Sequence, residues 1–424
     1  MGTNLATLLT DTAGRHGDGI ALKLDDVEVN YGLLDEGSAR VAGLLARHGF
    51  ERGDRVGIML PNVPYFALVY YGVLRAGGVV VPVNPLLKAR EVRFYLEDSG
   101  AKIIFAWHDF QEEATEGANA AGADLIAVAP GEFENLVQHA DPIHDVVDVE
   151  GDDTAVLLYT SGTTGEPKGA ELTHSNLKRN VEVTLETLIQ IDERDTLLGA
   201  LPLFHSFGQT CGLNCAVAAG ARLTLIPRFD PDKALEIIER DRVTIFEGVP
   251  TMFAAMLNSA KKDEVDLSCL RLCVSGGAAM PGEIRRAFEE QFDCKVLEGY
   301  GLSETSPVAS FNHPDRERKE GSIGTPIEGV EMRVVGEDRN EVPQGEVGEI
   351  AIKGHNVMKS YWNRPEATEE AIADGWFLTG DMAYVDEDGF FFIVDRKKDM
   401  IIRGGYNVYP REIAEVRYEH EAVA

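Results

Sequence analysis

Short apolar runs rich in valine and isoleucine alternate with longer amphipathic segments over the first three quarters of this chain. Parallel strands need a crossover connection, and a helix is the usual one. The alternation therefore predicts an α/β fold, with doubly wound, largely parallel sheets that carry helices on both faces. Strands are predicted at 55–60, 78–82, 102–106, 155–158, 222–226 and 243–246. Helices are predicted at 33–48, 64–76, 89–99, 175–188 and 233–240.

The pattern changes after about residue 321. Segments 330–335, 348–353 and 390–394 are short, the first two alternate, and turn residues separate them, which predicts antiparallel strands and a small β-barrel subdomain. The charged residues 396–399 then interrupt the apolar pattern and indicate a hinge. We therefore expect an α/β core over 1–320, a β-rich subdomain of the same domain over 321–395, and a new unit from 396 to 424.

Composition excludes several classes of function. Hydrophobic residues make up 44% of the 424 residues, which rules out wholesale disorder. The formal charge of −31 makes nucleic acid and anionic membrane surfaces poor partners. The basic residues are mostly arginine, so the acidic surface indicates either an ordinary acidic enzyme, which we favour, or adaptation to a high-salt cytoplasm.

The sequence predicts a soluble, cytoplasmic protein. Residues 1–10 lack the features of a signal peptide, and the most apolar long window, 66–83, contains Arg75 and two adjacent glycines, so no integral membrane segment is expected. An odd number of cysteines without a secretory signal indicates a reducing compartment. The five cysteines are Cys211, Cys215, Cys269, Cys273 and Cys294.

Two cysteine pairs, 211/215 and 269/273, have the four-residue spacing of one helical face. A metal site would use such a face, but no cluster of histidine and cysteine completes the ligand set. We favour the simpler interpretation that these are small buried apolar side chains.

The segment from Tyr159 to Gly169, YTSGTTGEPKG, is the densest group of phosphate-binding side chains in the chain. Its glycines let the backbone bring N–H groups close to an anion, its hydroxyls add donors, and Lys168 adds a positive charge. The segment is not a Walker A loop, which requires Gly-Lys followed by Ser or Thr. A flexible surface turn is the alternative, and a polyphosphate cradle, aided by the positive end of a helix near Ser175, is favoured.

This segment resembles the signature of the adenylate-forming superfamily, which contains acyl-CoA synthetases, luciferases and peptide-synthetase adenylation domains. Further similar motifs occur in the family's order, and they are LPLFHSFG (201–208), GYGLSET (299–305), GWFLTGD (375–381), DRKKD (395–399) and GGYNVYP (404–410). The resemblance covers nearly the whole chain. It implies that residues 396–424 begin a small, mobile α+β C-terminal domain.

The resemblance implies a site for ATP and Mg²⁺. Thr160, Ser161, Gly162, Thr163, Thr164, Gly165 and Lys168 match the phosphate-binding segment, and Glu304 matches the magnesium ligand. Ser303 matches a residue that contacts the α-phosphate, and Asp381 and Arg396 match ribose-binding residues. The adenine site is implied at Gly276, Gly277, Ala278, Glu298, Gly299, Tyr300 and Gly301, with Tyr300 stacking on the base. Outside such motifs, single charged residues like Glu304, Asp381 and Arg396 usually lie on solvent-exposed faces.

His205 resembles a residue beside the acyl carboxylate. We expect it to orient that group rather than act as a general base, because a carboxylate is already ionised at neutral pH. The expected catalytic residues are thus Lys168, Glu304 and His205. The expected acyl pocket is small or apolar, which favours a fatty or aromatic acid over an amino acid. It comprises His205, Phe207, Gly208, Thr210, Val249, Met252, Gly277, Gly301, Leu302 and Val308.

The family transfers the acyl group to coenzyme A after its small domain swings. Lys398 matches the hinge position, and Gly404 and Gly405 match the pantetheine channel. The family carries a catalytic lysine for adenylation in a segment later than Ala424, so the sequence as given is expected to be impaired in adenylation and more so in thioester formation.

The primary hypothesis is a medium- or long-chain fatty acyl-CoA synthetase that uses ATP, Mg²⁺ and coenzyme A. The alternatives are an aryl-acid ligase, a luciferase-like oxygenase, and a nucleotide- or acyl-binding protein without turnover. The partners expected are small molecules, and a homodimer is left open.

Overall fold

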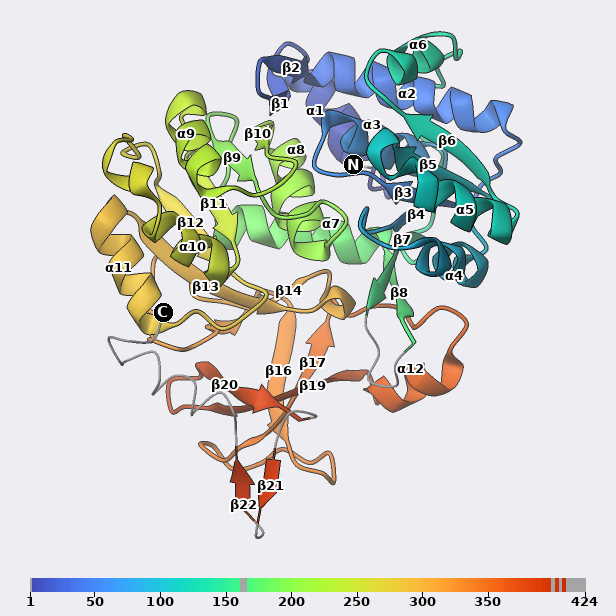
Figure 1. The fold of residues 1–424 in the computed structure, drawn as a ribbon. Helices are drawn as coiled ribbons and strands as arrows, with labels where there is room; N and C mark the ends of the chain where they lie inside the picture. The colour runs from blue at the N-terminus through green and yellow to red at the C-terminus, as the bar shows by residue number, and fades with distance from the viewer. Residues whose placement is uncertain (1, 161–165, 398–400, 404–405, 409–424) are drawn as a thin grey trace.

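Two large sheets lie side by side in the upper part of the molecule, and a third sheet lies below them (Figure 1). The computed structural model describes residues 2–160, 166–397, 401–403 and 406–408. No helix in these ranges is both long enough and apolar enough to cross a membrane.

The first sheet has six strands in the order β6-β5-β3-β4-β7-β8. Its strands are β3 (Arg55–Met59), β4 (Val79–Pro82), β5 (Ile103–Trp107), β6 (Asp124–Val128), β7 (Thr154–Thr160) and β8 (Lys168–Thr173). All neighbours are parallel except β7 and β8, which are antiparallel. Two helices, α4 (Ala89–Ser99) and α5 (Gln111–Ala121), pack apolar side chains on the outer face.

The second sheet has nine strands in the order β15-β14-β13-β12-β11-β9-β10-β1-β2. These are β1 (Ile20–Leu24), β2 (Val27–Asn30), β9 (Thr196–Gly199), β10 (Arg222–Leu225), β11 (Ile245–Gly248), β12 (Leu272–Ser275), β13 (Lys295–Gly301), β14 (Val308–Phe311) and β15 (Thr325–Pro326). The inner strands from β1 to β13 are parallel, and β2, β14 and β15 are antiparallel. The outer face carries α9 (Pro231–Asp241), α10 (Pro250–Leu257) and α11 (Gly282–Phe292).

One continuous apolar core joins the inner faces of the two large sheets. Buried residues of α3 (Pro64–Arg75) and α7 (His174–Val183) belong to this core together with residues from β3 and β9. The remaining helices are α1 (Thr7–His16), α2 (Tyr31–Arg47), α6 (Glu132–Gln138), α8 (Cys215–Ala219) and α12 (Pro365–Ala371), with short 3₁₀ segments η1 (His108–Phe110), η4 (Ala260–Asp263) and η5 (Ser303–Thr305). Two π-helical segments, η2 (Thr184–Leu188) and η3 (Gly208–Asn214), continue into or out of α-helices.

The third sheet is antiparallel and forms a half-barrel, as the alternating pattern predicts. It contains β16 (Val330–Val335), β17 (Gly348–Gly354), β18 (Ile372–Ala373), β19 (Trp376–Val385) and β20 (Phe391–Arg396). A separate two-stranded hairpin, β21 (Ile401–Arg403) and β22 (Tyr406–Val408), follows it. The α/β class and the β-rich region are therefore confirmed.

The structure corrects three local expectations. Residues 168–173, assigned to no element from the sequence, form β8, because they pair with β7 in a hairpin. The predicted helix 175–188 is α7 followed by the π-helical η2. Cys269 and Cys273 do not share a helical face, because Cys269 lies outside any helix or strand and Cys273 lies in β12. All five cysteines are free thiols, and four of them are buried.

His174, the first residue of α7, is buried at the join between β8 and the N-terminal segment. Its Nδ1 accepts a hydrogen bond from the backbone N–H of Leu5 at 2.9 Å, and only 1% of the residue is exposed. Burial lowers the pKa of His174 from 6.5 to about 4, because a charged ring would lose its hydration. The folded state therefore holds this ring neutral.

We predict that His174 makes folding sensitive to mild acid. The unfolded chain takes up the imidazole proton near pH 6.5 and the folded chain only near pH 4, so the stability from this group is present above pH 6.5 and is lost as the pH falls toward 4. Between pH 7 and pH 4.5, wild type should lose about 2 kcal/mol more unfolding free energy than His174→Gln in urea titrations. An exposed-site control, His139→Gln, should follow wild type, and equal losses in wild type and His174→Gln would contradict the assignment.

Candidate functional site

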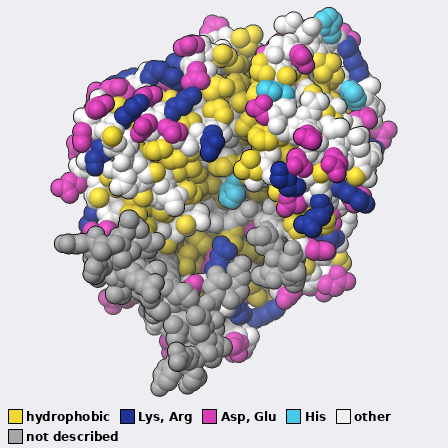
Figure 2. All heavy atoms as spheres, viewed as in Figure 1, with side chains coloured by type: hydrophobic (Ala, Val, Ile, Leu, Met, Phe, Trp, Pro, Cys, Tyr) yellow, Lys and Arg dark blue, Asp and Glu magenta, His cyan; other side chains and the backbone are white. Residues whose placement is uncertain are grey.

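A cavity of about 990 Å³ opens where the three sheets meet. Figure 2 shows hydrophobic side chains lining a hollow in the middle of one face of the molecule. The carboxyl ends of β4, β7, β12 and β13 contribute residues to its wall, and so do β19 and β20 of the antiparallel sheet. Ligands in α/β proteins bind at this edge of a parallel sheet, because the loops that follow the strands converge there.

Residues 359–362 run along the outer edge of β8 and bring a distant part of the chain to the cavity. Backbone hydrogen bonds join Glu171 to Ser360 (2.9 Å), Lys359 to Glu171 (2.9 Å) and Trp362 to Gly169 (2.8 Å). An antiparallel bridge pairs Ala170 with Tyr361. This pairing satisfies the backbone groups of the edge strand and fixes the position of Tyr361.

Glu304 lies at the centre of the polar end of the cavity. Its Oε1 accepts hydrogen bonds from the hydroxyls of Thr160 (3.1 Å) and Tyr361 (2.9 Å), and only 8% of the residue is exposed. The backbone N–H of Met358 donates to the Glu304 carbonyl at 2.8 Å, which anchors η5 to the segment that carries Tyr361. Within the ranges that the structure describes, Oε2 has no hydrogen-bond partner, which suits a carboxylate that binds a cation together with phosphate oxygens and water.

Lys168 stands opposite Thr160 in the register of the β7–β8 hairpin. Its ammonium nitrogen lies 5.2 Å from the centroid of the Tyr361 ring, at cation–π distance. It forms no ion pair with a carboxylate in the described part of the chain. The charge of this half-buried lysine is therefore available to an anion in the cavity.

The hairpin geometry rules out the expected contribution of a helix N-terminus near Ser175. The strand β8 lies between the loop and α7, and Thr173, at its end, pairs with Thr154 at the start of β7. Six residues of strand span about 20 Å. The N-terminus of α7 thus lies at the opposite end of the hairpin from Lys168. Its first N–H groups donate to the carbonyls of Asp153 and Gly151, and a capping box joins Thr173 and Asn176.

Asp381 forms a second polar cluster on β19. The hydroxyl of Tyr300 donates to its Oδ2 at 2.6 Å, and the Nε of Arg396, its register partner on β20, lies 3.6 Å from Oδ1. Burial raises the pKa of Asp381, and the hydrogen bond from Tyr300 and the charge of Arg396 oppose that rise. The expected adenine-stacking residue and the expected ribose-binding residues are therefore in direct contact.

His205 faces the cavity from the segment that precedes η3. The backbone N–H of Phe207 points to its Nδ1 at 3.4 Å, which leaves the proton of the neutral ring on Nε2. Although the residue is exposed to the cavity, the surrounding walls reduce its hydration and lower its pKa. At neutral pH His205 is thus an uncharged hydrogen-bond donor rather than a cation.

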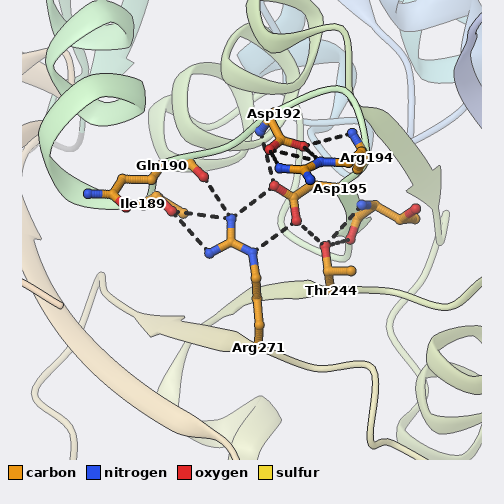
Figure 3. Close-up of polar contacts among 8 residues, drawn as sticks. Ile189, Gln190, Asp192, Arg194, Asp195, Thr244 and Arg271 are labelled. Atoms are coloured by element: carbon orange, nitrogen blue, oxygen red, sulfur yellow. Dashed lines mark hydrogen bonds and ion pairs between the residues drawn. The ribbon is translucent and has the colours of Figure 1, made fainter.

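Arg271 fixes the wall that η2 contributes (Figure 3). Arg271 immediately precedes β12. Its guanidinium donates to both oxygens of Asp195 at 2.9 Å. It also donates to the backbone carbonyls of Ile189 and Gln190, which follow η2 and cannot be satisfied within that helix. Burial favours the neutral form of Asp195, but hydrogen bonds from Arg271 and Thr244 outweigh burial and lower its pKa. Ile189 lines the cavity, and so do Gly276 and Gly277 beyond the other end of β12, so this network ties two parts of the wall together.

The structure brings most of the expected residues into one cavity. Those that line it are Thr160, Lys168, His205, Phe207, Gly276, Gly277, Gly299, Tyr300, Gly301, Leu302, Ser303, Glu304, Val308, Asp381 and Arg396. The loop residues Ser161, Gly162, Thr163, Thr164 and Gly165, the hinge residue Lys398, and Gly404 and Gly405 lie outside the described residues.

Six expected residues are not part of the cavity wall, and they are Gly208, Thr210, Val249, Met252, Ala278 and Glu298. Met252 lies on α10 and packs against the outer core, while the Oε1 of Glu298 accepts a hydrogen bond from the Met280 N–H. A methyl group at Gly277 would lie 3.5 Å from Val249, which therefore stands behind the wall. Neighbours in sequence point to opposite faces of a strand or helix, and motif position alone does not separate them.

The family model for an AMP-binding enzyme matches residues 9–362. A long-chain-fatty-acid–CoA ligase of Bacillus subtilis is 37% identical, over 99% of this chain and 81% of the relative. A feruloyl-CoA synthase of an Amycolatopsis species is 40% identical, over 97% of this chain and 81% of the relative.

The chain belongs to the AMP-binding enzyme family. The resemblance that the motifs carry, and with it the expectation of an adenylate-forming enzyme, is confirmed. ATP-bound MatB from Rhodopseudomonas palustris is similar in fold, with a TM-score of 0.91 and 33% identity over 97% of this chain and 82% of that one. The anthranilate CoA ligase AuaEII in complex with anthranoyl-AMP has a TM-score of 0.93 and 27% identity over 99% and 82%.

Sequence reasoning missed several residues that line the cavity of this family member. The clearest are Tyr361, which holds Glu304, and the pair Glu349 and Lys397, whose side chains meet at 2.8 Å. The aromatic pair Tyr361-Trp362 before Pro365 is the one local signal for Tyr361, since aromatic residues in a loop often serve a site. Nothing local marks Glu349, which reaches the site through pairing of β17 with β19.

We predict that the Tyr361 hydroxyl stabilises the fold through Glu304. Tyr361→Phe keeps the ring beside Lys168 but removes one hydrogen bond to a buried carboxylate, which should lower the free energy of unfolding by about 1–2 kcal/mol. The matched control is Tyr384→Phe, because Tyr384 stacks on Phe392 and its hydroxyl has no hydrogen-bond partner in the described ranges. Urea titration should separate the two variants, and equal stability would show that the hydrogen bond contributes nothing.

Proposed function

We propose that this enzyme uses ATP and Mg²⁺ to convert a medium- or long-chain fatty acid into an acyl-adenylate, and that the complete reaction passes the acyl group to coenzyme A. The observation that carries the proposal is one cavity with two kinds of wall. The unpaired ammonium of Lys168 and the Glu304 carboxylate lie in the same cavity as a wall of leucine, isoleucine, valine and phenylalanine side chains. A triphosphate needs the charged groups, and an acyl chain needs the apolar wall.

Adenylation brings two anions together, so the site must neutralise charge and hold an in-line geometry. In this proposal Lys168 binds the β- and γ-phosphates, and Glu304 holds a magnesium ion that screens the phosphate charge. Asp381 binds the ribose hydroxyls and Tyr300 lies against the adenine. His205 donates from Nε2 to the acid carboxylate and orients it without removing a proton, because the acid is already ionised.

The names of similar proteins support activation of a carboxylic acid. They include ligases of fatty acids and of aromatic acids, so the acid has two candidate classes. Long-chain-fatty-acid–CoA ligases are 34–37% identical to this chain, and feruloyl-CoA synthases are 40% identical. The similar structures include a benzoate CoA ligase from Burkholderia xenovorans LB400 at 29% identity and a TM-score of 0.92. An aryl-acid ligase is therefore the second candidate function.

Replacement of the two charged residues tests the nucleotide half of the proposal. Lys168→Ala should weaken ATP binding at least tenfold, and Glu304→Ala should lower magnesium-dependent pyrophosphate exchange by about a hundredfold, since each loses a contact to developing phosphate charge. The controls Lys359→Ala and Glu366→Ala change exposed residues of the same types and should match wild type. Full activity of both site variants would overturn the assignment.

A panel of acids tests the acyl half. Trapping of the acyl-adenylate with hydroxylamine should give hydroxamates from straight-chain fatty acids, with kcat/KM rising with chain length as more methylene groups are buried. Faster turnover of aromatic acids than of any fatty acid would favour the second candidate. Binding of ATP without hydroxamate from any acid would leave a binding protein and reject both.

A further inference from the structure

Glu247 is a buried carboxyl in the second sheet, next to a strand that contributes to the cavity wall. It lies on β11 beside Val274 of β12, and Val274 lines the cavity. Only 2% of Glu247 is exposed. The proposed function does not use this residue.

The carboxyl of Glu247 has no polar or charged partner in the parts of the chain that the structure describes. Its Oε1 is fully buried without a hydrogen bond, and no lysine or arginine there forms an ion pair with it. Burial raises its pKa from 4.5 to about 8, so at neutral pH the group is a neutral carboxylic acid. Such a group both donates and accepts hydrogen bonds.

Other buried carboxylates of this chain are paired. Glu171 accepts from the hydroxyls of Thr154 (2.7 Å) and Ser360 (2.5 Å), and Asp241 meets Lys23 at 2.8 Å and Thr224 at 2.6 Å. These groups hold the fold together, which is the ordinary use of a buried charge. Glu247 stabilises no neighbour in this way, and an unpaired buried polar group costs about 1–3 kcal/mol.

The cavity wall contains further polar groups that have no hydrogen-bond partner among the described residues. Cys211 lines the cavity and lies close enough to Glu247 for the carboxyl to raise the pKa of its thiol, after the larger effect of burial. The hydroxyls of Thr184 and Ser206 are buried without a partner, and both residues line the cavity. Most buried polar groups in proteins are satisfied, so unpaired groups around one ligand cavity indicate that a ligand completes them.

Gly212 leaves space beside the carboxyl on the η3 side, next to the cavity-lining Cys211. It follows Cys211 in η3, and a methyl group placed on it would lie 3.5 Å from the Oε2 of Glu247 with no other atom within 4 Å. The absence of a side chain there leaves room beside the carboxyl. Any other side chain would begin in contact with the carboxyl.

We propose that Glu247 is a specificity-determining residue that hydrogen-bonds a hydroxyl group at the far end of the acyl chain, so that the preferred substrates are apolar acids with a distal hydroxyl. This inference rests on the proposed function, because it requires the acid to bind in this cavity. A site built to bind a hydroxyl rejects the analogue that lacks it, because its own polar groups then stay unpaired.

The test compares straight-chain fatty acids with ω-hydroxy acids of the same length, and cinnamic acid with para-hydroxycinnamic acid. The measured quantity is the ratio of kcat/KM for each hydroxy acid to that of its parent acid, from hydroxylamine trapping. Wild type should favour a hydroxy acid. Glu247→Leu should lower that ratio at least tenfold, mainly because the parent acid improves, whereas Glu247→Gln should keep most of it.

Gly212→Ala provides a variant that keeps Glu247 and adds only a methyl group in ordinary contact with it. This variant should also lower the ratio, and its parent-acid activity shows that the protein is folded. If Glu247→Leu fails to fold, Gly212→Ala decides the question. A ratio that is the same in wild type and in the folded variants would overturn the inference.

A binding measurement separates this inference from the proposed function. Non-hydrolysable acyl-sulfamate analogues of the adenylate, with and without the terminal hydroxyl, are titrated into wild type and variants. Hydroxamates formed without hydroxyl preference, together with equal analogue affinities, would reject the role of Glu247 and leave the proposed function intact. No hydroxamate from any acid and no analogue binding would reject both.

Discussion

The hydrogen bonds between residues 359–362 and the outer edge of β8 determine where the site can form. An edge strand left bare would expose unpaired backbone groups, and the segment that pairs with it delivers Tyr361 to the position where it meets Lys168 and Glu304. Three segments far apart in sequence, the β7–β8 hairpin, η5 and residues 359–362, thereby share one polar cluster. The loop proposed to bind phosphate connects the two strands of a hairpin that this pairing holds in place, whereas in nucleotide-binding folds of the Walker type such a loop leads into a helix N-terminus.

The rest of the cavity is likewise built from segments that lie far apart in the sequence. Parallel strands of two sheets end at it, and the antiparallel sheet adds Asp381 and Arg396 from the other side. Charged groups such as Lys168 and Glu304 lie in one part of the wall, and η2 and η3 contribute Leu188 and Cys211 to another part. The Arg271 network holds η2 against β12, so the apolar wall is as firmly anchored as the polar one.

The sequence predicted the α/β class, part of the strands and helices and part of the cavity wall, and the particular failures have physical causes. The strand β8 was missed because residues 168–173 lack a long apolar run and depend on pairing with β7. Met252 and Thr210 were expected in the acyl pocket from their positions in the chain, but neither lines the cavity, and Met252 packs against the outer core. Tyr361 and Glu349 were missed because pairing between strands distant in sequence places them.

What the sequence alone determined is the chemistry available: a loop of hydroxyls, glycines and a lysine, the carboxylates of Glu304 and Asp381, and an apolar set with the composition of an acyl pocket. These are properties of short segments, which motifs record. Only the tertiary structure decided which groups meet, that Glu304 is held by Thr160 and Tyr361, and that the carboxyl of Glu247 is buried with no partner among the described residues. The reason is that contacts between sheets depend on the register and packing of strands hundreds of residues apart, which no local pattern encodes.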